Sequence, residues 1–323
     1  MPFQPPFKSV TIQGTRAGPR LIVLGAVHGN ETCGTVAQQR VLADIDAGAL
    51  TIAAGRVTFV PVANALAYAR GQRTGDRNLN RALGPIASPV AFEDHVANWL
   101  CPLLAAHDVL LDLHSFQAQG EPFVMVGPLD NDGAVEPFAL ADREHALARH
   151  LGVRRAVDGW LGTYAAGARR RAARAVTGDG SHDIDWHCGV GTTEYMRSTG
   201  GCALTLECGQ HADPAAPDVA ERAIRNTLAW LRLVDRDAPP DEQAMESLHL
   251  DRVVDKLHPG DTLARAWRSF DPVDSGTLIA TRADGEELRA TWRGRVVFPN
   301  VAAQPGEEWF YMARESTRFS DAA

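Results

Sequence analysis

The chain has 323 residues, about twice the length of a typical domain, which predicts one large domain with a smaller one or two domains of similar size. Hydrophobic residues make up 45% and charged residues 22% of the sequence, values that exclude a disordered or fibrous chain. The net charge of −8 disfavours nonspecific binding to nucleic acid or to an anionic membrane, and no apolar stretch reaches the roughly 20 residues of a membrane-spanning helix.

The first part of the chain, from residue 11 to about 233, alternates short apolar runs with longer segments of helical period. This pattern is typical of an α/β domain, in which strands that are apolar almost throughout are covered by helices on both faces. We expect strands at 20–26, 57–62, 109–113, 123–126 and 203–206, and helices from 32 into the forties and at 91–106, 136–151 and 219–234.

The sequence changes character after the last of these helices. Residues 235–242 contain Pro239 and Pro240 among acidic residues, which predicts a linker. From 248 to 314, short extended runs are separated by Pro-Gly and Asp-Gly pairs, typical of strands joined by turns. The sequence therefore predicts a domain of residues 1–238 and a smaller C-terminal all-β domain of residues 239–323, whose role, covering a pocket or serving assembly, stays open.

The candidate site residues follow predicted strands. His28 and Glu31 come directly after one apolar strand and His114 ends another, and ligand sites in α/β sheets form beyond the carboxyl ends of strands. Two histidines and one glutamate around Zn²⁺ leave a position for water, as in catalytic zinc sites. Asp112 is placed to hold a ligand imidazole. The alternative is that His28 and His114 are separate, hydrogen-bonded histidines of the core or of loops.

A third apolar strand ends on Glu207. Burial among apolar neighbours should raise the pKa of this carboxyl group toward neutrality, which suits it to accept a proton from water and to give it to a leaving amine. The alternative is a structural carboxylate in an ion pair.

Residues 70–81 contain four arginines within twelve residues of an acidic protein. Guanidinium groups bind carboxylates through two parallel hydrogen bonds, so the segment invites an anionic substrate. A solvated loop with ion pairs explains the composition equally well.

Taken together, these segments resemble the succinylglutamate desuccinylase and aspartoacylase family, which is related to the zinc carboxypeptidases. The resemblance covers about residues 15–235 and depends on five short segments in the same order, which are HGNE at 28–31, Arg73, NLNR at 78–81, DLH at 112–114 and LECG at 206–209. It implies a carboxypeptidase-like mixed sheet flanked by helices, with acylase activity located in residues 1–238.

The resemblance also implies a role for each site residue. By analogy, His28, Glu31 and His114 bind one Zn²⁺ per chain, Glu207 is the general base and acid, Arg73 polarises the scissile carbonyl, Asn80 and Arg81 hold a substrate carboxylate, and Arg197, ten residues before Glu207, grips another.

The chain departs from the family pattern at two motifs. Asn78 stands where members commonly have aspartate, and Asn64 is followed by Ala65 where they have proline. We expect neither change to touch the metal centre, although both bear on which acyl amino acid is bound. A family tyrosine from the C-terminal region has no clear counterpart, since Tyr311 lies in no recognisable motif.

Two further segments have other interpretations. His182, Asp183 and His187 lie in a Gly-rich stretch, which favours a mobile loop near the pocket over a second metal site. The arginine-rich run at 169–174 is expected to be a solvated helix face rather than a nucleic-acid site.

The resulting hypothesis is a zinc-dependent hydrolase that cleaves the amide bond of a small anionic N-acyl amino acid. The alternatives are a metallocarboxypeptidase acting on peptide C-termini and a non-catalytic binding module with the same fold. No nucleic-acid or membrane partner is expected, a homo-oligomer is left open, and a start without an export signal makes the cytoplasm the default location.

Overall fold

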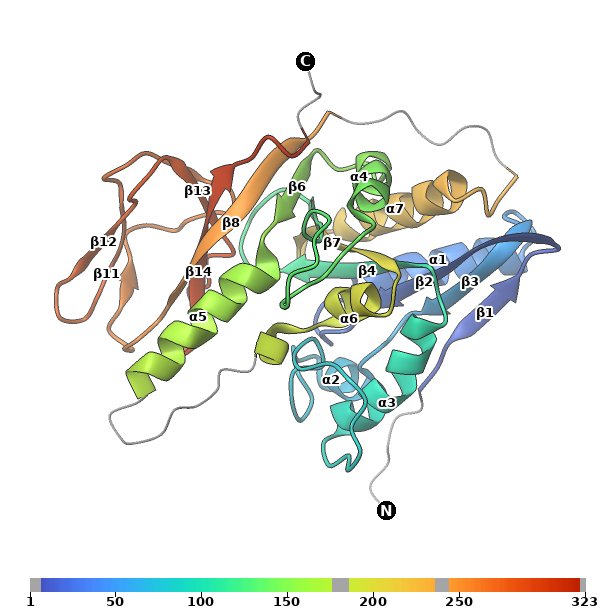
Figure 1. Cartoon of the computed structure of the whole chain (residues 1–323), viewed down its shortest axis with the longest axis horizontal. Coiled ribbons are helices and arrows are strands. Elements are labelled where there is room, and N and C mark those ends of the chain that lie inside the picture. Colours follow the sequence, from blue (N-terminus) through green and yellow to red (C-terminus); the bar gives the residue numbers. More distant parts are fainter. Residues whose placement is uncertain (1–6, 176–185, 236–243, 320–323) are drawn as a thin grey trace.

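The computed structural model describes residues 7–175, 186–235 and 244–319. Within these ranges, eleven strands form one mixed sheet in the order β1-β3-β2-β4-β7-β5-β6-β8-β14-β13-β10, and three short strands form a separate antiparallel sheet (Figure 1). The strands of the large sheet are β1 (Val10–Gln13), β2 (Arg16–Gly25), β3 (Ala54–Val60), β4 (Val109–Phe116), β5 (Phe123–Met125), β6 (Arg155–Asp158), β7 (Cys202–Gln210), β8 (Glu246–Asp255), β10 (Pro272–Val273), β13 (Gly294–Val297) and β14 (Glu308–Glu315). Those of the small sheet are β9 (Thr262–Leu263), β11 (Leu278–Thr281) and β12 (Glu287–Arg289).

Helices cover both faces of the sheet in its first half. The described helices are α1 (Cys33–Asp46), α2 (Ala65–Arg70), α3 (Phe92–Ala105), α4 (Ala141–His150), α5 (Trp160–Ala175), α6 (Thr192–Ser198) and α7 (Ala216–Trp230), with a short 3₁₀ turn, η1 (Trp186–Gly189). The predicted class, an α/β fold with a mixed, helix-flanked sheet, is confirmed.

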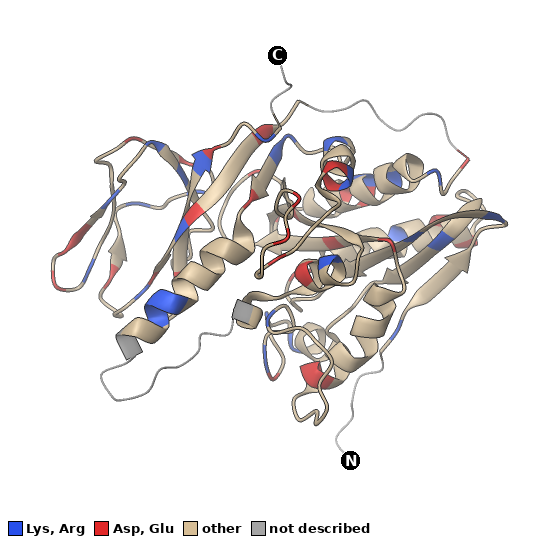
Figure 2. Ribbon diagram, in the orientation of Figure 1, with Lys and Arg blue, Asp and Glu red and all other residues tan. Residues whose placement is uncertain are grey.

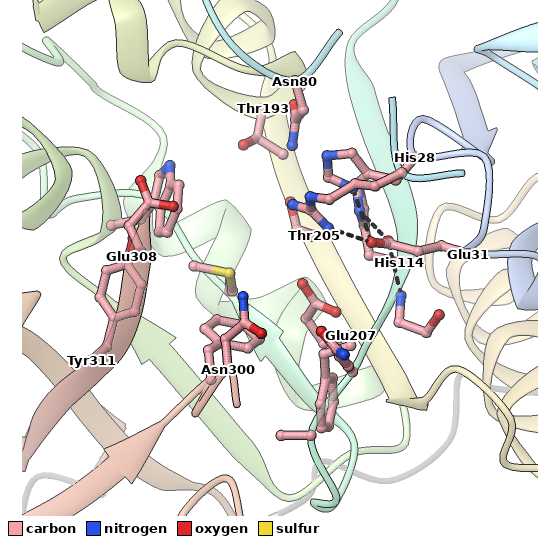
Figure 3. Close-up of a pocket in the computed structure, with 18 of the residues that line it drawn as sticks. His28, Glu31, Asn80, His114, Thr193, Thr205, Glu207, Asn300, Glu308 and Tyr311 are labelled. Atoms are coloured by element: carbon pink, nitrogen blue, oxygen red, sulfur yellow. Dashed lines mark hydrogen bonds and ion pairs between the residues drawn. The ribbon is translucent and has the colours of Figure 1, made fainter. Parts of the chain in front are cut away.

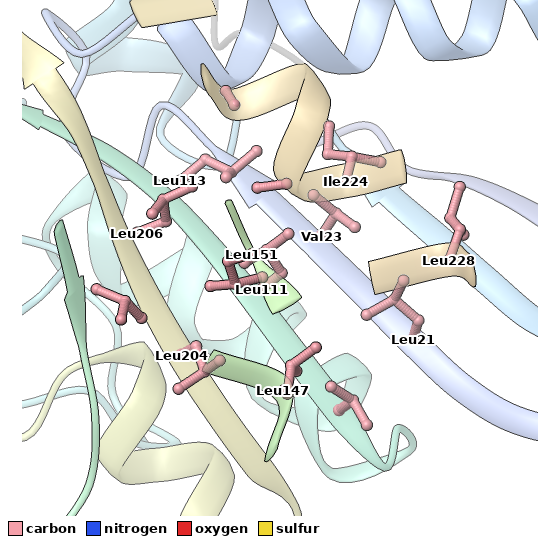
Figure 4. Close-up of a cluster of buried hydrophobic side chains, with 14 of the residues drawn as sticks. Leu21, Val23, Leu111, Leu113, Leu147, Leu151, Leu204, Leu206, Ile224 and Leu228 are labelled. Atoms are coloured by element: carbon pink, nitrogen blue, oxygen red, sulfur yellow. The ribbon is translucent and has the colours of Figure 1, made fainter. Parts of the chain in front are cut away.

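The alternation of side chains along β2 shows why the sheet is covered on both sides. Leu21 and Val23 pack in one cluster with residues of α1, α4 and α7, while Ile22 and Leu24 pack in a second cluster with residues of α3. Figure 4 shows the first cluster, in which Ile224 and Leu228 of α7 lie over the strands. Since successive side chains point to opposite faces, a strand that is apolar throughout needs a helix on each side.

The predicted elements are largely present, with differences at their ends. The helix expected from 136 starts at Ala141, because Pro137 and Phe138 belong to an irregular segment in which Asn131 bridges Phe138, and Asp130 accepts a hydrogen bond from the amide of Ala141. Strands β1, β6, β8, β9 and β10 and helices α2 and α6 were not predicted, and only the end of α5, at 169–174, was expected to be helical.

The C-terminal region continues the large sheet. Strand β8 pairs in parallel with β6 and antiparallel with β14, so the sheet crosses from one predicted domain into the other. The division at residues 238 and 239 therefore stays a prediction, located in a segment that lies outside the described residues. The predicted β character of the C-terminal region agrees with its strands.

The arginine-rich run forms the end of α5, where basic residues cluster in Figure 2. Arg170 donates to the carbonyl of Val253 and Arg171 binds Asp255, both on β8, so this part of the helix packs on the sheet rather than standing free in solvent. No helix in the described ranges is long and apolar enough to cross a membrane.

Candidate active site

The candidate site lies at the carboxyl ends of three parallel strands at the centre of the sheet. β2 pairs with β4 and β4 with β7, and the register places His114 of β4 beside Glu207 of β7. The loop after β2 supplies His28 and Glu31. Three segments far apart in the sequence therefore deliver their side chains to one place, as the strand-end argument predicts.

The predicted metal ligands meet in this place. His28, Glu31 and His114 each offer a ligand atom within 4.8 Å of the others, and all three side chains are buried. His28 Nδ1 lies 3.0 Å from Glu31 Oε1, and His114 Nδ1 lies 2.8 Å from Glu31 Oε2 (Figure 3). Both imidazoles thus present the same nitrogen, Nδ1, to one carboxylate.

The opposite nitrogens of the two rings are held by other side chains. His28 Nε2 lies 3.2 Å from Asn78 Oδ1, and His114 Nε2 lies 2.9 Å from Asp112 Oδ2, which also accepts a hydrogen bond from the hydroxyl of Thr192. A proton on Nε2 leaves the lone pair of Nδ1 directed at the shared site, the arrangement by which neighbouring groups orient metal-binding histidines. Asp112 lies beside His114, as expected, and its role in orienting a metal ligand stays a prediction. Asn78 contacts His28, so the change at this position borders a candidate metal ligand, contrary to the expectation that it leaves the metal centre untouched.

The glycine of the HGNE segment is required for space rather than for turning. Gly29 does not have a positive φ, whereas Ala26, just after β2, does, at 48°. A Cβ atom on Gly29 would lie 2.0 Å from the carbonyl carbon of Ala67. Glycine therefore lets the loop that carries His28 and Glu31 pack against the backbone of α2.

The electrostatics of the cluster suit a cation. Burial, assisted by the nearby charge of Arg73, lowers the pKa of His28 to about 4, which keeps the ring neutral. Burial alone would lower the pKa of His114, but Asp112 and Glu31 outweigh it and raise this pKa well above its usual value. In the absence of a metal, a proton on His114 is thus the positive charge that the two carboxylates stabilise.

These residues fit a single metal ion. His28 Nδ1 is buried and makes no hydrogen bond with any residue that the structure describes, although Glu31 lies within 3.0 Å. A buried nitrogen without a hydrogen bond, next to a buried carboxylate and a second imidazole, is a costly arrangement unless a ligand completes it. Two histidines and one carboxylate form the donor set of catalytic zinc centres.

Glu207 faces the same site from β7 and is almost completely buried. Burial, reinforced by repulsion from Glu31, raises its pKa to about 8, although His114 and Arg73 oppose the rise. Its Oε2 atom has no hydrogen-bond partner in the described part of the chain. A carboxyl group that binds and releases a proton near neutral pH is suited to acid–base chemistry.

The arginine-rich segment borders the site, and a buried carboxylate organises it. Glu93 of α3 accepts hydrogen bonds from the amides of Gly75, Asp76 and Arg77 and from the side chain of Asn64. No sequence signal marked Glu93, which lies within an ordinary amphipathic helix. It fixes the loop between the metal ligands and the predicted substrate-binding residues.

Three predicted polar residues of this segment line the cavity. Arg73, half exposed, donates to Glu31 Oε1 at 2.8 Å. Asn80 accepts a hydrogen bond from the amide of Thr192, and its side chain points into the cavity in Figure 3. The guanidinium of Arg81 lies 4.9 Å from the ring centroids of Trp160 and Tyr164.

Arg197 also reaches the cavity wall, but carboxylates surround its guanidinium. Nε donates to Glu144 at 2.8 Å, Nη1 donates to Glu136 at 2.9 Å, and Nη2 donates to the carbonyl of Ala203 at 2.8 Å. Its role as the anchor of a second substrate carboxylate stays a prediction. His182 and Asp183 lie outside the described residues, and His187 belongs to η1.

The cavity that contains these groups has a volume of about 320 Å³. The C-terminal region forms part of its wall through Phe298, Pro299, Asn300, Glu308 and Tyr311. Sequence reasoning missed four of these residues and could not assign Tyr311, because isolated polar and aromatic residues in short strands carry no motif. Of the two roles left open for this region, covering the pocket is the one that the lining residues support.

A buried His-Glu-His cluster at strand ends, in one cavity with a buried carboxyl group, fits the donor set of hydrolases that bind one metal ion. Comparisons with known proteins narrow this class to one family. A family model described as the succinylglutamate desuccinylase/aspartoacylase catalytic domain matches residues 17–130.

Two relatives match over most of the chain. The N-alpha-acetyl-L-2,4-diaminobutyric acid deacetylase of Halomonas elongata is 33% identical over 285 residues, which are 84% of this chain and 72% of the relative. The succinylglutamate desuccinylase of Burkholderia thailandensis is 27% identical over 325 residues, covering 97% and 84% of the two chains. The chain therefore belongs to the succinylglutamate desuccinylase/aspartoacylase family, whose members hydrolyse N-acyl amide bonds.

Solved structures agree with this fold. The ectoine utilization protein EutE (DoeB) from Ruegeria pomeroyi, in a product-bound structure, has a TM-score of 0.68 at 22% identity, covering 95% of this chain and 88% of that one. The succinylglutamate desuccinylase/aspartoacylase from Rhodobacter sphaeroides has a TM-score of 0.71 at 18% identity, covering 96% and 90%.

Proposed function

We propose that this chain is a zinc-dependent deacylase that hydrolyses the amide bond of a small N-acyl amino acid. The observation that carries the proposal is the buried convergence of His28, Glu31 and His114 opposite Glu207 in one cavity. When bound by the three ligands, zinc would supply Lewis-acid polarisation of the scissile carbonyl and would make the attacking water more acidic.

The chain's own residues move the protons. Glu207 accepts a proton from the attacking water and passes it to the amine that leaves, with no acyl-enzyme. A carboxyl group with a pKa of about 8 is a stronger base than an ordinary glutamate, and its protonated form can still donate near neutral pH. Arg73, adjacent to Glu31, places a guanidinium where negative charge develops on the carbonyl oxygen.

The segment at residues 70–81, whose loop is held by Glu93, binds and orients the substrate. Asn80 and Arg81 hold the carboxylate of the substrate. The Oδ1 atom of Asn80 is occupied by the amide of Thr192, which leaves the side-chain NH₂ group to donate. Arg197 is proposed at the same wall, with less capacity for a second carboxylate because Glu144 and Glu136 already bind it.

The cavity favours a small substrate over a peptide. Its volume of about 320 Å³ suits a compact amide, and residues 298–300 of the C-terminal region close one side. One relative is named for acetyl-diaminobutyric acid and others for succinylglutamate, so we propose N-acyl amino acids as the substrate class. An extended peptide would need an open groove instead.

The test is a reconstitution assay. The chain is stripped of metal with a chelator, reloaded with one equivalent of zinc, and given N-acetyl and N-succinyl amino acids beside dipeptides of matched length. We expect amine release from N-acyl amino acids only in the reloaded protein, and none from a His114→Ala variant. Faster cleavage of the dipeptides would indicate a carboxypeptidase, and no cleavage of any amide at full zinc occupancy would indicate a binding module.

A further inference from the structure

The basic side chains that line the cavity are unequally available to a substrate. Arg73 is paired with Glu31 at 2.8 Å, and Arg197 is bound by Glu144 and Glu136. Arg81, by contrast, makes no ion pair with any described residue. Its guanidinium donates only to the carbonyl of Asn80, at 2.8 Å, so among the described residues the cavity offers one guanidinium without a carboxylate partner, which is enough for one substrate carboxylate.

The positive charge of Arg197 is outnumbered by the carboxylates around it. Glu144 binds it at 2.8 Å and Glu136 at 2.9 Å, and a third carboxylate, Glu194, lies 3.6 Å from Nη1 and also lines the cavity. Three carboxyl groups surround one guanidinium in a buried position. A second substrate carboxylate at this end of the cavity would meet an excess of negative charge.

The wall opposite the metal ligands adds a further carboxylate. Figure 3 shows Glu308 and Tyr311 side by side, across the cavity from His28 and Glu31. Residues three apart in a regular strand face opposite sides of the sheet, but β14 has a register shift between Glu308 and Phe310 where it pairs with β8. The resulting irregularity turns both side chains toward the cavity, as bulges near binding sites commonly do.

Both groups lack a proper partner in the described structure. The hydroxyl of Tyr311 is buried and makes no hydrogen bond with any described residue. The cation nearest to Glu308 among them is Arg171, at 3.8 Å, and Arg171 is engaged by Asp255 at 2.7 Å. A buried hydroxyl without a partner, next to a weakly compensated carboxylate, is a site prepared for a ligand that carries hydrogen-bond donors.

We propose that the cavity selects an N-acyl amino acid with one carboxylate and a positively charged side chain, and that Glu308 receives the positive charge. The inference rests on the proposed deacylase function. Arg81 holds the carboxylate, and the hydroxyl of Tyr311 can accept a hydrogen bond from the same ammonium group. Trp160 is near both Arg81 and Tyr311, with its ring centroid 4.9 Å from the guanidinium of Arg81 and 5.6 Å from the ring of Tyr311.

The test uses three N-acetyl amino acids that differ in side-chain charge. These are Nα-acetyl-2,4-diaminobutyrate, whose side chain is cationic, N-acetylglutamine, whose side chain is neutral, and N-acetylglutamate, whose side chain is anionic. kcat/KM is measured for zinc-loaded wild type, for Glu308→Gln, and for Glu315→Gln as the control. Glu315 lies on the same strand but is exposed at its end, so this variant makes the same charge change outside the cavity.

We expect wild type to prefer the cationic substrate and to use the anionic one least. Glu308→Gln should lower kcat/KM for the cationic substrate about tenfold, the size of a lost charge-assisted hydrogen bond, and should lower it much less for the neutral substrate. Glu315→Gln should match wild type on all three. An equal loss on every substrate, or a preference for N-acetylglutamate, would overturn the inference.

A second measurement separates this inference from the proposed function. Free 2,4-diaminobutyrate and free glutamate are titrated calorimetrically into the metal-free protein, which needs no turnover. We expect tighter binding of diaminobutyrate, and loss of that difference in Glu308→Gln. If no amide is hydrolysed but the difference in binding is present, the charge preference holds and the deacylase assignment fails. Equal binding of the two amino acids refutes the charge preference itself.

Discussion

Replacing Arg197 with methionine tests whether this arginine holds the fold together or holds the substrate. Its side chain is only 4% exposed, and it connects β7, through the carbonyl of Ala203, with α4, through Glu144. Methionine keeps much of the apolar bulk but removes the charge and the donors. We expect the variant to fold but to unfold far more easily than wild type.

The size of the expected loss of stability follows from the carboxylate that would be left without a counter-charge. Glu144 is fully buried and would keep two hydrogen bonds, from the amides of Gly127 and Ala203, but would lose its counter-charge. Removing one partner of a buried ion pair costs about 3–5 kcal/mol. For a chain of this size that corresponds to a fall in Tm of about 4–7 °C.

The loss of stability in Arg197→Met should become smaller as the pH falls. Burial raises the pKa of Glu136 to about 7, although Arg197 opposes the rise. Without Arg197, the folded variant holds the proton on Glu136 to higher pH than the unfolded chain does. Because its folded state then binds more protons, the variant should recover stability relative to wild type as the pH falls from about 8 toward 5.

The assay is denaturant unfolding at several pH values, with Arg289→Met as the control. Arg289 makes an exposed ion pair with Glu287 at 2.8 Å, for which we expect a loss below about 1 kcal/mol. If Arg197→Met instead unfolds like wild type and raises KM for N-acyl amino acids, Arg197 is a substrate anchor. The argument that Arg197 is neutralised by neighbouring carboxylates, and cannot bind a second substrate carboxylate, would then be refuted as well.

Three further predictions concern single residues. Glu207→Gln should retain zinc, measured by metal analysis, but lower kcat by about 10²–10⁴-fold, and unchanged turnover would remove Glu207 from the reaction. Asn78→Ala should weaken zinc binding about 10–100-fold in competition with a chelating dye, because His28 loses the group that orients it, whereas equal affinity would show that the contact is incidental. His107 is buried, both of its ring nitrogens are hydrogen-bonded, and burial lowers its pKa. The unfolded chain therefore takes up a proton on this residue more readily than the folded chain, so wild type should lose stability as the pH falls below about 6.5. His107→Gln should make the stability depend less on pH. Identical pH profiles of the two proteins would contradict that assignment.

The central half of the fold was predictable because its physical signal is local. β2, β4 and β7 are apolar over most of their buried length, so both their existence and their covering by helices followed from the sequence. The positions of His28, His114 and Glu207 followed in turn, since parallel strands in one sheet end at the same edge.

The parts that were not predictable depend on contacts between distant segments. Asn78 meets His28 across a loop, and only the folded position of that loop connects the Asn-for-Asp change with the metal centre. Arg197 meets Glu144 and Glu136 from 53 and 61 residues away, in a segment where the predicted helix began too early. No spacing rule describes such pairs.

The side chains at the far end of the cavity were unpredictable for a related reason. Glu308 and Tyr311 face the same way only because the pairing of β14 with β8 is irregular, and regular alternation along the strand would have separated them. The groups proposed for catalysis thus come from the regular centre of the sheet, where strand ends coincide. The groups proposed for selecting the substrate come from irregular or long-range contacts, which can change without disturbing the central strands. Relatives that share the HGNE, DLH and LECG segments can therefore differ in substrate through residues such as Glu308 and Glu194, and assignment of a substrate should begin from the charges that line the cavity.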